Sequence, residues 1–217
     1  MIDVSELNIL QFRRGMEQWE EGKRLICVLD ADALARTRRD VAFSSALSEA
    51  DILVPGDCFT VLAIKAMHAK AAPREPVTGT DLFRFEMDRL EQRGGGLCFF
   101  LGGTPGKLEV IRKKTSERYP HIRVDGFCPE FRPYFSKSED EAILDAVKAA
   151  DPDLLWVWMG RPKQEKWMYY NWNKLDIHCH ACIAESTLDY YAGSSLLAAF
   201  KRIRDFFSGF GSFMGVL

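Results

Sequence analysis

A glycine-rich turn, FFLGGTPGK at residues 99–107, contains residue types that can hold a phosphate group. Gly102, Gly103 and Thr104 stand at the end of an apolar run. Glycines after a strand let backbone N–H groups approach a phosphate, and the next helix offers its positive end to an anion. The segment is neither GxGxxG nor a Walker A motif, so a tight turn without a ligand is an equal alternative.

The segment WMGRPKQEKW, residues 158–167, places polar side chains directly after another apolar run. Gly160 and Pro162 favour a turn, and proline suits the first turn of a helix. A cation, an amide and a carboxylate there can bind phosphate oxygens and sugar or base hydroxyls together, so we predict ligand contact by Lys163, Gln164 and Glu165. In the alternative, Glu165 only complements the helix dipole and Lys163 is solvated.

Aspartates follow two further apolar runs. Asp57 is a candidate general base for an incoming hydroxyl, or equally the N-cap of a helix that begins near Thr60. Asp30 and Asp32 have the spacing by which many sugar-transfer enzymes hold a divalent metal on a nucleotide diphosphate. We favour a different interpretation, in which Asp30 lines the site and Asp32 caps its helix.

The scaffold that positions these residues can be inferred from the alternation of short apolar runs with stretches of helical period. This alternation is typical of β-α-β units, and runs without polar alternation indicate parallel strands covered on both faces. We predict a single α/β domain: a doubly wound, mostly parallel sheet with helices on both faces and a ligand site at the carboxyl ends of its strands. The predicted strands are 25–29, 51–54, 97–101, 121–124, 154–159 and 177–184.

Capping patterns predict where two helices begin. Ser138 followed by Glu141 has the spacing of a capping box. Thr80 can cap a helix that carries apolar residues as far as Leu90 and stops at the glycines 94–96.

Composition excludes some classes of protein. The 217 residues include 29 basic and 31 acidic side chains, for a net charge of −2, which argues against a basic nucleic-acid binder. No export signal or membrane-spanning segment is encoded, so we predict a cytoplasmic protein with reduced cysteines. Cys179 and Cys182 form one CxxC beside His178 and His180, but no second pair completes a zinc site, and the alternating pattern favours a buried strand.

Residues 196–217 differ from the preceding domain, 1–195. Apolar residues share one helical face, basic residues lie opposite, and an aromatic, nearly uncharged tail follows. Such an amphipathic segment can lie on an anionic membrane surface. Packing on the domain or on a second copy of the chain stays open as an alternative.

The motifs of this chain, taken together and in their order along the sequence, resemble those of the WecG/TagA/CpsF glycosyltransferases, family 26. The resemblance covers residues 28 to 193, and GRPKQE is its most specific part. The matching segments are RRDVAF…ALSEADILVPGD (38–57), PVTGTDL (76–82), FFLGGTPG (99–106), YPHIRVDGF (119–127), DPDLLWVWMGRPKQEKW (151–167) and LDYYAG (188–193).

The resemblance implies a Rossmann-like fold and an inverting transfer of a sugar from a UDP-sugar to a polyprenyl-diphosphate-linked acceptor. It implies a reaction without metal or cofactor, at the cytoplasmic face of the bacterial inner membrane, in surface polysaccharide synthesis. UDP-sugar would lie across the turns at 102–104 and 160–165, with Asp189 on its ribose or sugar side. Asp57, or failing that Asp30, would be the base.

The chain departs from the family pattern on the acceptor side. The family's Pro-Asp-Gly is here Pro55-Gly56-Asp57, and its Thr-x-Asn is Val28-Leu29-Asp30. The longer basic appendage of the family is missing. A diverged, non-catalytic nucleotide-binding module that supports a polysaccharide-assembly complex is therefore the alternative hypothesis. A dinucleotide oxidoreductase is disfavoured because no GxGxxG with a following acidic residue is present.

Overall fold

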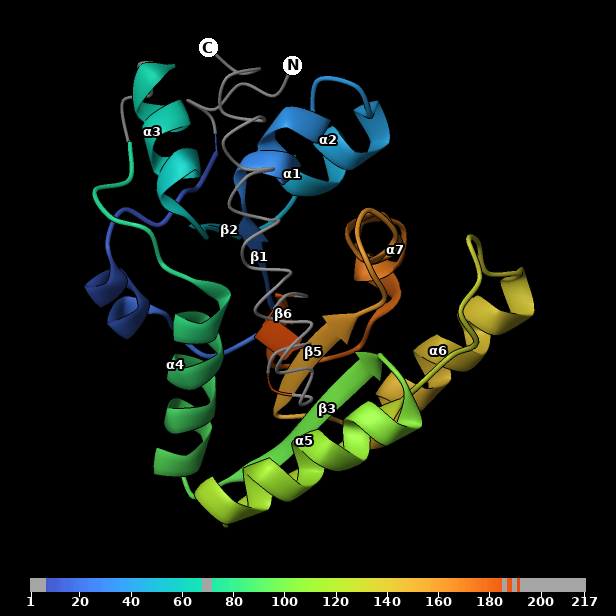
Figure 1. Ribbon diagram of the computed structural model, residues 1–217. Helices are drawn as coiled ribbons and strands as arrows, with labels where there is room; N and C mark the ends of the chain where they lie inside the picture. Colours follow the sequence, from blue (N-terminus) through green and yellow to red (C-terminus); the bar gives the residue numbers. More distant parts are fainter. Residues whose placement is uncertain (1–6, 68–71, 185–186, 189–190, 192–217) are drawn as a thin grey trace.

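The computed structural model describes residues 7–67, 72–184, 187, 188 and 191 (Figure 1). The predictions for Asp189 and for residues 196–217 lie outside these described residues. Among the described helices, none has the length and apolar character needed to cross a membrane.

Parallel strands form one six-stranded sheet in the order β2-β1-β6-β5-β3-β4, which confirms the predicted doubly wound α/β fold. All six predicted strands are present, although the sixth begins three residues later than expected, at His180. Their bounds are β1 (Arg24–Leu29), β2 (Ile52–Pro55), β3 (Gly96–Gly102), β4 (Ile122–Phe127), β5 (Leu154–Trp158) and β6 (His180–Ile183).

Helices cover both faces of the sheet because side chains alternate along each buried strand. On the first face, strand residues such as Cys27 pack with Phe43 and Met168. On the second face, strand residues such as Ile26 pack with Phe83. The first face is covered by α1 (Ala31–Arg36), α2 (Val41–Ser48), α3 (Cys58–Ala66), α6 (Lys137–Ala150) and α7 (Lys163–Asn171), and the second by α4 (Gly79–Gln92) and α5 (Pro105–Arg118). Short 3-10 helices η2 (Arg13–Gln18) and η3 (Trp172–Lys174) complete the described elements.

Two helices begin at other residues than their sequence patterns predict. The α4 capping box is made by Thr78 with Asp81, not by Thr80. The α6 capping box is made by Ser136 with Glu139, not by Ser138. In α6 two serines stand two residues apart, each followed three residues later by a glutamate, so local spacing alone cannot choose between them.

The connections after β3 and β5 leave the sheet on opposite faces. The chain runs from β3 into α5 on the second face, and α5 crosses in front of β3 in Figure 1. The chain runs from β5 into α7 on the first face. Because β3 and β5 are neighbours, their diverging connections open a crevice at the carboxyl edge, which is where open α/β sheets bind ligands.

Candidate functional site

A cavity of about 210 Å³ lies at this switch point between β3 and β5. Its walls come from the turn after β3, the turn after β5 and the loop between β4 and α6. The lining residues are Gly102, Gly103, Thr104, Lys107, Pro129, Glu130, Phe131, Phe135, Trp158, Met159, Gly160 and Lys163. The structure thus brings Gly102, Gly103, Thr104, Gly160 and Lys163 together, as the sequence predicts.

The glycines after β3 allow the two turns to approach each other. Gly103 has φ +72°, donates its N–H to the carbonyl oxygen of Trp158 at 2.8 Å, and would place a Cβ 2.4 Å from the Trp158 ring. Thr104 then caps α5 by accepting from the backbone N–H of Lys107 at 3.3 Å. Pro105 has no N–H and the N–H of Lys107 is taken up by Thr104, so it is the positive end of the α5 dipole at the crevice that can attract an anion.

Lysines from the two helices line the cavity, and each lies over an aromatic ring. The Lys107 Nζ is 4.9 Å from the centroid of the Trp158 ring. The Lys163 Nζ is 3.3 Å from that of Phe135 and donates to the carbonyl oxygen of Arg132 at 2.6 Å. Burial lowers the pKa of Lys163 from its usual value. The cavity therefore combines positive charge with aromatic surface.

Gln164 and Glu165 do not line the cavity. Gln164 is fully buried, and its Oε1 accepts from the backbone N–H of Met159 at 3.2 Å. Glu165 is 2% exposed, and burial raises its pKa although Arg161 opposes the shift. Pro162 is the N-cap of α7. In this structure these residues set the shape of the turn after β5, and the ligand contacts predicted for them stay predictions.

Arg161 connects that turn to the end of β1. Its Nη1 lies 2.7 and 2.6 Å from the two carboxylate oxygens of Asp30, and its Nε donates to Glu165 Oε1 at 3.0 Å. Asp30 is also the N-cap of α1, accepting from the N–H of Ala33 at 2.8 Å. The expectation that Asp32 caps this helix is wrong. The helix begins at Ala31, so the cap is Asp30 and Asp32 lies within the first turn.

Asp57 caps α3, as one of the two sequence interpretations predicts. Its Oδ1 accepts from the N–H of Thr60 at 2.7 Å, and its Oδ2 from the N–H of Ala31 at 3.1 Å. Burial raises the pKa of Asp57, and the nearby negative charge of Asp30 adds to the rise, while the two hydrogen bonds oppose it. Asp57 thus contacts the residue next to Asp30, and Asp30 binds Arg161, which adjoins Gly160 at the cavity. Neither aspartate lines the cavity.

Sequence reasoning missed part of the cavity wall. Lys107 stands in the glycine-rich segment, four residues after Gly103, and helical spacing after a cap could have indicated it. Phe131 and Phe135 belong to the aromatic, proline-containing segment CPEFRPYF, residues 128–135. No local pattern relates that segment to the other turns, because the contact depends on strand order.

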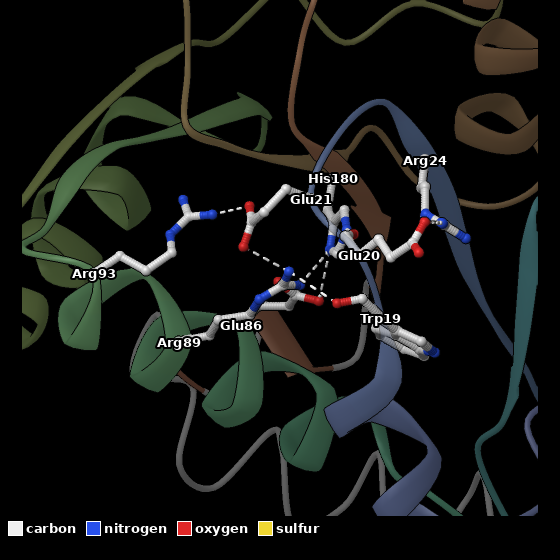
Figure 2. Close-up of polar contacts among 8 residues, drawn as sticks. All are labelled: Trp19, Glu20, Glu21, Arg24, Glu86, Arg89, Arg93 and His180. Atoms are coloured by element: carbon white, nitrogen blue, oxygen red, sulfur yellow. Dashed lines mark hydrogen bonds and ion pairs between the residues drawn. The ribbon is translucent and has the colours of Figure 1, made fainter.

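A second polar cluster lies at the amino end of β6, away from this cavity (Figure 2). His180 contacts Glu86 Oε1 through Nδ1 at 2.9 Å and the carbonyl oxygen of Glu20 through Nε2 at 2.9 Å. Arg89 binds Glu21 at 2.6 Å. These contacts tie α4 to the segment before β1, and the strand predicted around the CxxC is confirmed over residues 180–183. Within the described ranges, no three His, Cys, Asp or Glu side chains gather as a candidate metal site.

Comparison with known proteins identifies similar sequences. The family model described as "Glycosyl transferase WecG/TagA/CpsF family" matches residues 1–199. A similar protein from Bacillus spizizenii is named N-acetylglucosaminyldiphosphoundecaprenol N-acetyl-beta-D-mannosaminyltransferase and is 24% identical over 123 residues, which are 57% of this chain and 45% of that protein. A Staphylococcus aureus protein of the same name is 29% identical over 102 residues, 47% of this chain and 38% of that protein. The matches thus span less than half of either curated relative.

Proposed function

The chain belongs to the WecG/TagA/CpsF glycosyl transferase family, and from this premise we propose that it transfers a sugar from a UDP-sugar to an acceptor carried on a polyprenyl diphosphate. The names of the relatives, which act on a diphosphoundecaprenol-linked sugar, support the acceptor class. The observation that carries the proposal is the cavity at the β3/β5 switch point, with glycine turns on two sides and lysines on two helices.

In this proposal the donor's diphosphate lies against the first turn of α5. Thr104 lines the cavity at the positive end of the α5 dipole, and the ammonium group of Lys163 faces the same cavity. Together they would offset the negative charge that develops on the departing UDP, which is the role a divalent metal plays in other sugar transferases. No metal or other cofactor is part of the proposed reaction.

The transfer would invert the configuration at the donor C1. The acceptor hydroxyl attacks C1 from the face opposite UDP, the bond from C1 to the diphosphate oxygen breaks, and the hydroxyl proton passes to a carboxylate. We assign that carboxylate to Asp57 before Asp30, because burial raises the pKa of Asp57 toward the range useful for a general base. Both oxygens of Asp30 bind the cationic side chain of Arg161, which makes that carboxylate less basic, whereas those of Asp57 accept only neutral backbone N–H groups.

We propose the cytoplasmic face of the membrane as the place of the reaction. A membrane surface is favoured because a lipid-linked acceptor is confined to the bilayer. Residues 196–217, by their sequence, are the segment we propose for contact with that surface. A second copy of the chain is the alternative partner for this segment.

A second candidate function rests on one observation: both oxygens of Asp57 already accept backbone hydrogen bonds. A diverged module that binds the nucleotide without catalysis fits a carboxylate used only as a cap. The experiment that separates the two combines a panel of UDP-sugars with a lipid-diphosphate acceptor analogue and measures UDP release and sugar transfer. Transfer of any sugar supports the enzyme, whereas UDP binding by calorimetry without transfer or hydrolysis supports the module.

A further inference from the structure

The cavity has two chemically different walls. Thr104, the two lysines and Glu130 form the polar wall, in which the positive charges outnumber the negative one, whereas Trp158, Phe135 and Phe131 contribute aromatic rings. A ligand that fills both walls must carry an anionic part and a flat apolar part. A nucleoside diphosphate has this composition.

The three rings are not equivalent. Trp158 has Lys107 over its ring, and Phe135 has Lys163 over its ring. Phe131 lines the same cavity but is 92% exposed, and no ring or cation contact of this side chain occurs among the described residues. An aromatic side chain left in water at the mouth of a ligand cavity has a face available for stacking.

The loop that carries Phe131 is tied to the rest of the site. The carbonyl oxygen of Arg132, the next residue, accepts from Lys163 Nζ at 2.6 Å. The Arg132 side chain binds Glu130 at 2.6 Å and lies 3.5 Å from Glu139 of α6. These contacts hold Phe131 beside the lysine proposed for the diphosphate, so one nucleotide can reach both.

We propose that Phe131 is the stacking platform for the nucleobase of the donor and thereby determines that the site takes a nucleoside diphosphate rather than any diphosphate. This inference rests on the proposed function, since it names the part of the UDP-sugar that the loop binds. Base stacking on an aromatic side chain is sequence-tolerant, so the platform selects for a base more than for uracil in particular.

The test measures binding of UDP and of inorganic pyrophosphate by calorimetry to the wild type, Phe131→Ala and Tyr134→Ala. Tyr134 is the matched control, because it lies in the same loop and is 88% exposed but does not line the cavity. We expect Phe131→Ala to weaken UDP binding about tenfold, in line with the usual contribution of one stacked base, and to leave pyrophosphate binding unchanged. Tyr134→Ala should change neither, and Phe131→Trp should retain UDP binding.

UDP carries no transferable sugar, so a loss measured with UDP assigns Phe131 to the nucleoside and not to the donor sugar. The inference is overturned if Phe131→Ala binds UDP as well as the wild type does, or if its affinities for UDP and for pyrophosphate fall equally. It is also overturned if Tyr134→Ala shows the same fall in UDP affinity. A wild type that binds neither ligand would instead contradict the proposed function. Thermal melting of each variant checks that this exposed loop is not needed for folding.

Discussion

Arg161 and Asp30 are 131 residues apart in the chain, yet the guanidinium Nη1 lies within 2.7 Å of both carboxylate oxygens of Asp30. The pair joins the carboxyl end of β5 to that of β1, across β6, which lies between them in the sheet. Arg161 is largely buried and also binds Glu165, so one cation is shared by two carboxylates. The crevice is thereby fixed from one side by an ion-pair network.

The first prediction concerns the stability of this network. Arg161→Met should destabilise the fold by about 3–5 kcal/mol, because it leaves the buried Glu165 carboxylate without its cation. Urea unfolding followed by tryptophan fluorescence measures the change. The double variant Arg161→Met with Glu165→Gln should regain part of the lost free energy of unfolding, because burying a neutral amide costs less free energy than burying an unpaired carboxylate. An unchanged unfolding midpoint in Arg161→Met would contradict the network's structural role.

The second prediction separates the two roles of Asp57. Asparagine caps helices about as well as aspartate, so Asp57→Asn should keep the free energy of unfolding within about 1 kcal/mol while abolishing a general base. Asp57→Ala should lose the base and also about 1 kcal/mol of capping. Sugar transfer and urea unfolding are measured on both variants. Full transfer activity in Asp57→Asn would remove Asp57 from the role of base and leave only the cap.

The third prediction is a pH dependence. Burial raises the pKa of Asp57, so the protonated, inactive form persists to a higher pH than for an ordinary aspartate. The transfer rate should therefore fall as the pH drops through this raised pKa, with an acid limb above the usual range of an aspartate. The same shift means that the folded state holds its proton more tightly than the unfolded state, so this group's contribution to stability decreases as the pH rises through the same window. Asp57→Asn should abolish that component of the pH dependence of stability.

The fourth prediction compares a glycine of the turn after β3 with a glycine in the first turn of α5. Gly103→Ala should cost about 1–3 kcal/mol and weaken UDP binding, because φ is +72° and the new Cβ would lie 2.4 Å from the Trp158 ring. Gly106→Ala, three residues later in α5, meets nothing within 4 Å and should be neutral or slightly stabilising. Urea unfolding and calorimetry compare the two. Equal effects would show that the close approach of the turns is not what requires glycine.

The fifth prediction tests the charge of Lys163. Lys163→Gln should weaken the binding of UDP and the binding of pyrophosphate by about tenfold each, because the ammonium group is assigned to the diphosphate group that both ligands contain. Lys137→Gln is the control, since Lys137 is almost fully exposed on α6 and does not line the cavity. Calorimetry at two salt concentrations gives the readout, and the difference between wild type and Lys163→Gln should shrink at high salt. A loss confined to UDP would place Lys163 at the nucleoside instead.

The sequence alone determined the elements of this protein and the edge of the sheet on which its chemistry lies. Apolar runs alternating with helical periods predict all six strands, because these signals are local. The glycine turns at 102–103 and at 160 follow strands β3 and β5, and parallel strands put such turns on one edge. Ambiguous local signals limited the prediction of where helices begin: two serines fit the α6 cap, and the structure uses Ser136.

Strand order was decided by the tertiary structure, and with it the place of the cavity. Because β3 and β5 are adjacent in the sheet, the lysines of α5 and α7 lie at one crevice. The loop between β4 and α6 lines the same crevice, although no sequence spacing relates it to the lysines. The same packing buries Gln164 beneath its turn and joins Arg161 to Asp30. Such contacts depend on the simultaneous burial of apolar surfaces that are distant in the sequence, so a pattern that extends over a few residues cannot predict them.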